Sequence, residues 1–323
     1  MKKLKRTIML LALGAGAGFA HAQTGFPAQP VSLVVPFAAG SGADTVARVL
    51  AEGLEDEWKT SVIVVNRPGA GGQISMQHVA RAKPDGYTLG ITSSGTLAIN
   101  PSIYKDIKYD SLKSFEQVSI LAEVPFVVVV KNPSERMDLI SWIEHAKKHP
   151  GSVSIGNAGI GSHQYLAAHQ FAKSAGIELN MIPYAGGPAM AADLVGGSLD
   201  LVLDNTIVQL PFINGGRVKG LGISTESRVD FLPDIPTISE AGLPGYREIA
   251  WYGLAAPAGT PKEIVKAIQE ASAKALRKPE VTKKLNDTGV TVVVSTPEAA
   301  TEMVRQDIVR FKGLVEEIGL NPK

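Results

Sequence analysis

The sequence predicts an α/β fold of two lobes joined by two crossing strands. Short apolar runs alternate with amphipathic helical patterns, which is typical of parallel strands covered by helices. This alternation occurs in residues 31–92 and again in residues 137–224. A long apolar run at 120–130 separates the two sets, and a second apolar segment at 251–255 precedes a helical tail. The chain is therefore expected to cross between the lobes twice, so that the two crossing strands form a hinge.

The first residues have the pattern of an export signal. Lys2, Lys3, Lys5 and Arg6 precede an apolar stretch from 8 to 19, and the small residues of Ala20-His21-Ala22 follow. An apolar stretch of this length is shorter than the ~20 residues that span a bilayer. We expect cleavage after Ala22 and a periplasmic location; the alternative is a buried N-terminal helix. The expected division is a signal peptide over 1–22, lobe 1 over 23–124 plus 251–323, and lobe 2 over 125–250.

Composition excludes several classes of function. The formal net charge of the full chain is +1, and this includes the four cations of the signal segment, so the remainder is slightly acidic. Binding to nucleic acid or to an anionic membrane surface calls for a basic patch. The sequence has no cysteine, which excludes disulfides, thiolate metal sites and cysteine nucleophiles. We therefore expect no cofactor, no metal and no nucleic-acid partner.

The elements of the first lobe follow from local patterns. Val31, Leu33, Val34 and Val35 form a short apolar run, and the following Ser41 or Asp44 can cap a helix. Further apolar runs and turn signals predict strands at 62–66 and 87–92, a helix at 73–82, and a mostly irregular stretch at 100–119.

The second lobe repeats these patterns after the crossing run at 120–130. We expect helices at 137–149, from 163 to 176, from Pro188 onward and at 206–212, and strands at 153–157, 181–184, 199–204 and 220–224. Residues 225–260 are rich in proline and glycine and are expected to be mostly loop around the returning strand. Two helices should complete the chain, one begun by Thr260-Pro261 and one with apolar positions from 303 to 318.

Turns of small residues supply the candidate binding site. They lie at 38–43, 93–96, 158–163 and 184–187, each follows a predicted strand, and none contains Lys or Arg. Backbone N–H groups at helix starts, hydroxyls and bridging water can bind a carboxylate without an ion pair. Such turns also serve as simple connections in α/β folds, but four in one exported chain favour a solute receptor.

Other chemistries fit the sequence less well. Gly40-Ser-Gly42 lacks the third glycine of a dinucleotide fingerprint, and the phosphate loop that ends in Gly-Lys-Ser/Thr is absent. His145 and His149 are four residues apart, but Lys147 and Lys148 between them favour a solvated helix face over a metal site.

A hydrolase or isomerase that uses Ser162, His163 and Asp204 is the alternative function. No Gly-x-Ser-x-Gly elbow is present, and adjacent Ser162 and His163 diverge at a helix start. We expect instead that Ser162 caps the helix, that His163 is a polar residue at the cleft lip, and that Trp251 and Tyr252 line the cleft or belong to the core.

The chain closely resembles the extracytoplasmic solute receptors of tripartite tricarboxylate transporters, the Bordetella uptake gene family. The resemblance covers nearly the whole chain after the signal segment. Its markers are Val35-Pro-Phe37 with Gly40 and Asp44, Asn66-Arg-Pro-Gly-Ala-Gly-Gly72, Pro84-Asp-Gly-Tyr87, Pro183-Tyr184, Asp204-Asn205, Leu232-Pro-Asp-Ile-Pro-Thr237, Glu240-Ala-Gly-Leu-Pro-Gly245 and Ala256-Pro-Ala-Gly-Thr-Pro261.

The resemblance implies a type II periplasmic binding protein that acts as a monomer. It implies a small carboxylate ligand, a dicarboxylate or an aromatic carboxylate, held between the lobes and delivered to a membrane permease of one large and one small integral subunit. A receptor that signals to a membrane sensor kinase is a further alternative. Asp204 is expected to orient a donor or to meet an ammonium or hydroxyl of the ligand, because a free carboxylate would repel an anion.

Residues at the positions of the family's ligand loops are the candidate site. They are Phe37, Ala38, Ala39, Gly40, Ala43, Asp44, Ser93, Ser94, Gly95, Thr96, Asn157, Ala158, Gly161, Ser162, His163, Tyr184, Gly186, Asp204 and Asn205. The sequence departs from the family at Ala185, where many members carry Lys, at Ser75, where Gly is common, and in a first loop without the common Pro-Gly-Gly.

Overall fold

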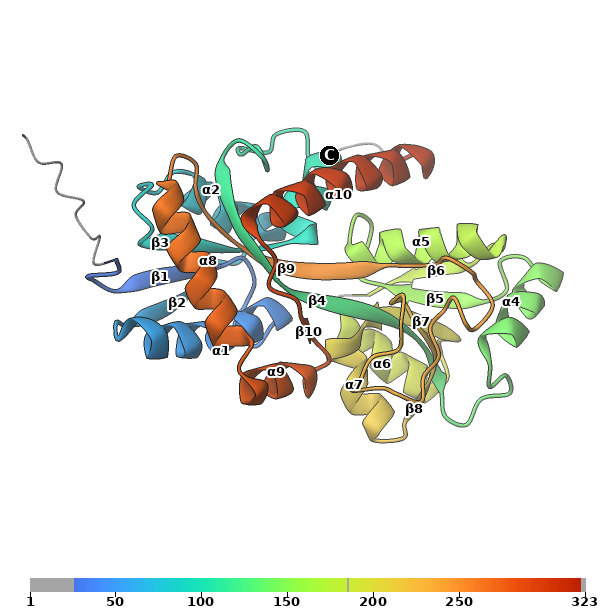
Figure 1. The fold of residues 1–323 in the computed structure, drawn as a ribbon. Helices are drawn as coiled ribbons and strands as arrows, with labels where there is room; N and C mark the ends of the chain where they lie inside the picture. The colour runs from blue at the N-terminus through green and yellow to red at the C-terminus, as the bar shows by residue number, and fades with distance from the viewer. Residues whose placement is uncertain (1–25, 185, 321–323) are drawn as a thin grey trace, which may run out of the picture.

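A computed structural model describes residues 26–184 and 186–320. The expected signal peptide, its cleavage after Ala22 and the departure at Ala185 lie outside these residues. Figure 1 shows two α/β halves, with the long strands β4 (Phe115–Lys131) and β9 (Ile249–Pro257) running between them. Among the described residues the strands form one continuous sheet in the order β2-β1-β3-β9-β4-β7-β5-β6, with β8 and β10 also paired to β4.

The first half begins with parallel strands, as the apolar runs predict. β1 (Val31–Val35) pairs in parallel with both β2 (Val62–Asn66) and β3 (Thr88–Ser93). The helical segments of this half are α1 (Gly42–Trp58), η1 (Ala70–Gly72), α2 (Gln73–Ala80), η2 (Gly95–Ile99) and α3 (Asn100–Ile103). The stretch expected to be irregular therefore contains a short helix and the start of β4.

The two crossing strands are antiparallel, and β4 changes partners along its length. Residues 115–125 of β4 pair with β9, whereas residues 126–131 pair with β7 (Leu201–Asn205) and β8 (Val218–Ile223). Pro125 stands at this change, where its missing N–H removes one possible ladder bond. The expected lobe boundary at residues 124 and 125 stays a prediction, and it lies beside this change of partners.

The second half repeats the β/α pattern around β5 (Ser154–Asn157). β5 pairs in parallel with β6 (Asn180–Pro183) and with β7. The helices of this half are α4 (Leu139–Lys148), α5 (His163–Ala175), α6 (Gly187–Gly196) and α7 (Thr206–Asn214). Each element lies within a few residues of its predicted range.

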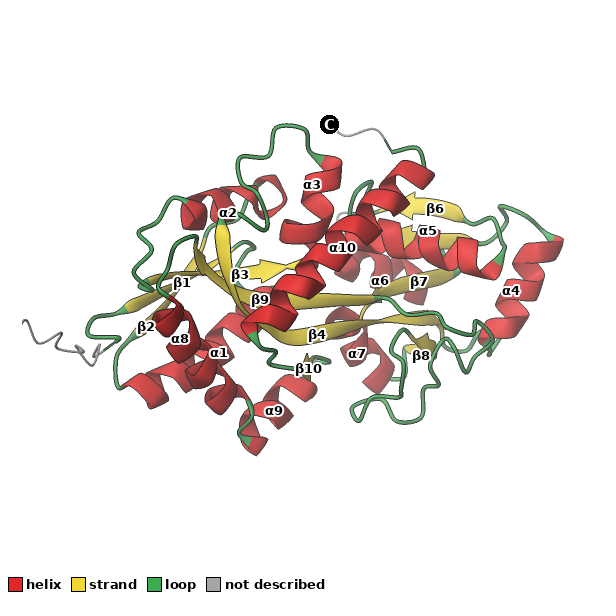
Figure 2. Ribbon diagram, turned by 45° about the horizontal axis from the view of Figure 1, so that its top comes forward, coloured by secondary structure: helices red, strands yellow, loops and turns green. Residues whose placement is uncertain are grey.

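The C-terminal tail returns to the first half and contains two elements that the sequence did not predict. α8 (Lys262–Leu276) and α10 (Pro297–Glu317) were expected, whereas α9 (Pro279–Asn286) and β10 (Thr291–Val292) were not. α9 is only 8 residues long and fully buries only Leu285, so its single apolar pair, Val281 and Leu285, is too short a pattern to predict a helix from the sequence. Figure 2 shows α10 lying along the crossing strands, where Phe311, Leu314 and Val315 are buried.

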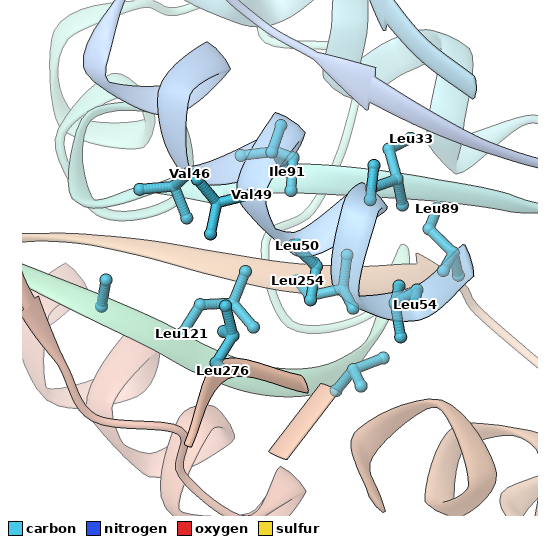
Figure 3. Close-up of a cluster of buried hydrophobic side chains, with 14 of the residues drawn as sticks. Leu33, Val46, Val49, Leu50, Leu54, Leu89, Ile91, Leu121, Leu254 and Leu276 are labelled. Carbon is cyan, nitrogen blue, oxygen red and sulfur yellow. The ribbon is translucent and has the colours of Figure 1, made fainter. Parts of the chain in front are cut away.

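Separate apolar cores support the two halves. Figure 3 shows the core of the first half, where Leu50 and Leu54 of α1 meet Leu33 of β1, Leu121 of β4 and Leu276 of α8. A second core around Phe126, Ile155, Phe171 and Leu203 lies under α4 and α5. No helix within residues 26–184 or 186–320 is both long and apolar enough to cross a membrane.

Candidate functional site

A cavity of about 430 Å³ lies where the two halves meet at the crossing strands. It is bounded by the ends of strands and starts of helices, the place where α/β folds present backbone N–H groups. None of the described residues that line it is Lys, Arg, Asp or Glu. The lining residues are Phe37, Gly71, Ser93, Ser94, Gly95, Ile99, Asn100, Tyr104, Ala158, Ile160, Gly161, Ser162, His163, Gln164, Asn205, Ala250, Trp251 and Tyr252.

The start of α5 forms one wall of the cavity. Ser162 has extended backbone angles and its hydroxyl accepts a hydrogen bond from the Tyr165 N–H at 3.1 Å, so it is the N-cap, as predicted. Asn157 shapes the preceding turn, because its Oδ1 accepts from the Gly159 N–H at 2.9 Å and its Nδ2 donates to the Ile182 carbonyl. The positive end of the α5 dipole therefore faces the cavity.

His163, the first residue of α5, connects the two halves. Its Nδ1 is 3.2 Å from the hydroxyl of Ser94, which follows β3, and its Nε2 is 2.6 Å from Oε1 of Glu248. Phe126 and Phe311 pack edge-on against the imidazole, with ring centroids 4.8 and 5.1 Å away. The side chain of His163 is only 9% exposed. The expectation of a residue at the cleft lip is therefore wrong: the imidazole lies at the base of the cleft.

Glu248 is a buried carboxylate held from two sides. Besides His163, it accepts two hydrogen bonds from the Arg310 guanidinium of α10, at 2.8 and 3.2 Å. Burial acts to raise the pKa of Glu248, but the hydrogen bonds that it accepts from His163 and Arg310, together with the positive charge of Arg310, outweigh burial and lower it. Glu248 is thus the carboxylate partner of His163, in a loop where no local pattern marks it.

Asp204 holds side-chain amides in place behind the cavity. It is fully buried, and its two oxygens accept from Nε2 of Gln164 at 3.0 Å and from Nε2 of Gln209 at 3.3 Å. Burial raises the pKa of this carboxyl despite these bonds. Burial of Tyr252 and the nearby charge of Asp204 raise the pKa of Tyr252 to about 12. The arrangement fits the expected role of orienting a donor.

Among the described residues that line the cavity, Asn205 has a buried donor without a partner. The Nδ2 group of Asn205 is buried and has no hydrogen-bond partner among the described residues, and Asn205 lines the cavity. A buried amide donor without a partner is costly, and a ligand oxygen would relieve that cost.

The first loop contributes less to the cavity than the sequence suggested. Phe37 lines the cavity, whereas Ala38, Ala39 and Gly40 are exposed and outside it. Asp44 is buried, and it accepts from the Gly40 N–H, Arg48 and Asn66. Burial acts to raise the pKa of Asp44, but these hydrogen bonds lower it. Asp44 therefore shapes the loop.

Four other predicted residues, Ala43, Thr96, Tyr184 and Gly186, do not line the cavity. Ala43 and Thr96 are fully buried, with the Thr96 hydroxyl bonded to Ser93, and the Tyr184 hydroxyl donates to Asp193 while Gly186 precedes α6. Of the candidate residues, the cavity brings together Phe37, Ser93, Ser94, Gly95, Ala158, Gly161, Ser162, His163 and Asn205.

The lining also contains residues that were not among the candidates. Gln164 directly follows two predicted site residues, so its place at a helix start was the available signal. Tyr252 and Trp251 were weighed as cleft or core. Gly71, Ile99, Asn100 and Tyr104 reach the cavity because η1 and α3 both pack against η2, the helical turn that follows β3.

The set proposed for hydrolysis is not assembled. The Ser162 hydroxyl is engaged in the cap of α5, Asp204 binds two amides, and His163 pairs with Glu248. Ser162, His163 and Asp204 therefore do not form a nucleophile, base and orienting carboxylate.

Comparisons with known proteins show the family. Residues 46–320 match the tripartite tricarboxylate transporter family receptor. Protein BugT of Bordetella pertussis is 33% identical over 325 residues, which cover 100% of this chain and 99% of that protein. The periplasmic binding protein BugD is 34% identical with a TM-score of 0.78, covering 92% of this chain and 100% of that one. An R. palustris protein solved with adipate is 32% identical, with a TM-score of 0.82 and the same coverage.

The fold and the cleft define a type II periplasmic solute-binding protein. The chain belongs to the tripartite tricarboxylate transporter receptor family, which includes the Bug proteins. The predicted family and fold class are confirmed, and so is the prediction of a binding protein rather than an enzyme, because the family and its solved members are binding proteins.

Proposed function

We propose that the protein captures a small carboxylate, a dicarboxylate or an aromatic carboxylate, between its two lobes in the periplasm. It then delivers this ligand to a permease of one large and one small integral membrane subunit. Support for the ligand class comes from the cavity, where uncharged donors gather and no cationic Lys or Arg stands among the described lining residues.

The donor set is the observation that carries the proposal. The unpartnered Asn205 Nδ2, the hydroxyl groups of Ser93 and Ser94, and the start of α5 all border one cavity. A carboxylate can accept from several such donors at once, and each hydrogen bond to a charged group contributes about 1.5–3 kcal/mol. The related R. palustris protein was solved with adipate, a dicarboxylate.

The cavity volume limits the ligand. A cavity of about 430 Å³ suits a small organic acid and leaves room for bridging water, whereas a nucleotide would need charged phosphate ligands that the lining lacks. The buried carboxylate of Asp204 lies behind Gln164, so an anion in the cavity meets amides rather than this charge.

Native mass spectrometry of the purified chain tests the proposal. We expect the spectrum to show a bound organic acid. Thermal-shift and calorimetric titrations with adipate, malate and benzoate then rank these acids by affinity. Chemical turnover of the bound acid by the protein alone, or a preference for neutral or cationic solutes, would contradict it. Uptake of the acid that binds most tightly, compared between cells with and without the receptor gene, tests delivery; a receptor that only signals would leave uptake unchanged.

A further inference from the structure

A chain of contacts joins α10 to the ligand cavity. Arg310 of α10 binds both oxygens of Glu248, Glu248 faces Nε2 of His163, and Nδ1 of His163 faces the hydroxyl of Ser94. Glu248 is 1% exposed and Ser94 is 2% exposed. The geometry of each contact leaves little choice of which atom carries each proton.

The carboxylate of Glu248 fixes the proton on one side of the imidazole. A carboxylate only accepts, so Nε2 of His163 carries a hydrogen and donates to it. In a neutral imidazole Nδ1 then has no hydrogen, and it accepts the hydroxyl hydrogen of Ser94. The Ser94 oxygen consequently offers only lone pairs to the cavity, which would repel a bound carboxylate.

Protonation of the imidazole reverses this last hydrogen bond. With hydrogens on both nitrogens, Nδ1 donates to the Ser94 oxygen, and the Ser94 hydroxyl hydrogen is free to point into the cavity. Ser94 then donates to the ligand, and the imidazolium supplies the positive charge that the lining otherwise lacks. The proton comes from solvent.

The surrounding charges accommodate an imidazolium. From α10, Arg310 contacts Glu248, and Asp307 is bonded to Arg310 and to Nε1 of Trp251. Glu248 lies just before β9. Ser94 lies just after β3 and is uncharged. Asp204 of β7 acts through Gln164, and Glu123 of β4 pairs with Arg247. Tyr252 of β9 lines the same cavity, and Phe126 and Phe311 flank the ring. The carboxylates of Glu248 and Asp307 face one guanidinium, so the cluster accommodates the positive charge that the imidazole gains when a carboxylate also enters the cavity.

We propose that His163 takes up a proton when the protein binds a carboxylate, and that Glu248, fixed by Arg310, is the positioning residue that keeps the imidazolium aimed at Ser94. The inference rests on the proposed function, because it specifies how that ligand is held. It assigns a role in ligand capture to Glu248, just before β9, and to Arg310 of α10, although neither residue lines the cavity.

Calorimetry measures the proton directly. Titration of adipate in two buffers of different ionisation enthalpy, between about pH 6 and 8, gives the number of protons taken up with the ligand. We expect uptake that approaches one proton per adipate at the upper end, and an affinity that falls by up to about tenfold per pH unit there. Tight adipate binding without proton uptake across this range would overturn the proposal.

Variants separate the positioning role from stability. Glu248→Gln should weaken adipate binding by about tenfold and flatten its pH dependence, and His163→Gln should abolish the proton uptake. The matched control is Glu317→Gln, which removes the exposed ion pair between Glu317 and Lys173 that also joins α10 to α5. The control should keep both the affinity and the pH profile of the parent protein. Equal effects of the control and Glu248→Gln would contradict the proposal.

A ligand-free measurement distinguishes this inference from the proposed function. Long-range ¹H–¹⁵N NMR of histidine-labelled protein should show His163 with its hydrogen on Nε2, and Glu248→Gln should weaken that preference. A hydrogen on Nδ1 alone in the unliganded parent protein overturns the positioning role, whether or not any acid binds. Failure of adipate, malate and benzoate to bind the parent protein overturns the proposed function instead. If Glu248→Gln does not fold, Ser94→Ala leaves the Glu248–Arg310 pair intact and should reduce both affinity and proton uptake.

Discussion

A methyl group added at Gly42 should act as a wedge between the two lobes. Gly42 is the first residue of α1, in the first half of the molecule. An ideal Cβ atom there would lie 2.6 Å from Cδ1 of Ile207, on α7 of the second half, and 2.7 Å from the hydroxyl of Tyr252, on β9. We therefore expect Gly42→Ala to oppose the approach of α1 to α7.

The cost follows from these distances. Ordinary contacts begin near 3.4 Å, so each neighbour must retreat by about 0.8 Å. Both clashing atoms are ends of side chains, which places the cost in the lower part of the usual range for overpacking, about 1–2 kcal/mol. Separated lobes avoid the clash with Ile207 but not the one with Tyr252, which pairs with Ser93 of β3, so about half of this cost, ~0.5–1 kcal/mol, opposes ligand-induced closure. The dissociation constant should rise about two- to fivefold.

Calorimetry with adipate, or with the acid that binds most tightly, measures the effect on affinity. Small-angle scattering with and without that acid measures closure. Gly313→Ala is the control, because it adds the same methyl group to α10 where nothing lies within 4 Å. Alanine favours a helix more than glycine does, so propensity cannot explain a loss at either position. Unchanged affinity and normal compaction for Gly42→Ala would refute the reasoning.

Further predictions concern stability. The buried Thr206 hydroxyl lies within hydrogen-bond distance of the Pro125 and Gly289 carbonyls, so Thr206→Val should cost about 1–3 kcal/mol in urea unfolding, and an unchanged midpoint would contradict this. Ser162→Ala removes the cap of α5 and should cost about 1 kcal/mol, measured the same way; a loss of affinity with full stability would show that the hydroxyl serves the ligand instead. The pKa of Glu248 lies below its ordinary value of 4.5, so the unfolded chain binds this proton more readily. The free energy of unfolding should therefore fall as the pH drops through and below about 4.5, and Glu248→Gln should make that slope shallower; an identical slope would show that Glu248 does not contribute.

Local patterns were sufficient where an element buries a repeated apolar face. β1 and α1 are examples. Leu33 of β1 and Leu50 and Leu54 of α1 are fully buried in the same core, and they also occur at strand and helix spacing in the sequence. The cap at Ser162 was equally local, since a cap needs only its own following turn. α9 was missed because it is short and fully buries only Leu285, so its sequence contains just one helical repeat of apolar residues, Val281 and Leu285.

The site depended on contacts that no local pattern contains. The sequence placed Ser94 and His163 at the ends of strands, but it gave no reason to pair His163 with Glu248, 85 residues away. The sequence also predicted Gly40 as a site residue. In the structure Gly40 is exposed and lies outside the cavity, whereas Gly71 and Tyr104 line it. Which turns face the ligand depends on how η1 and α3 fold back, and this is settled by packing at long range.

By itself, the sequence determined the family, the alternating strands and helices, and an anion site built from small turns without Lys or Arg. These features are written in local periodicity and in ordered motifs. Only the tertiary structure decided which turns line the cavity and that His163 lies at its base between Ser94 and Glu248. The physical reason is that a hydrogen bond between distant residues depends on the relative positions of whole elements, here α5, α10 and the crossing strands, and the packing of their buried faces fixes those positions.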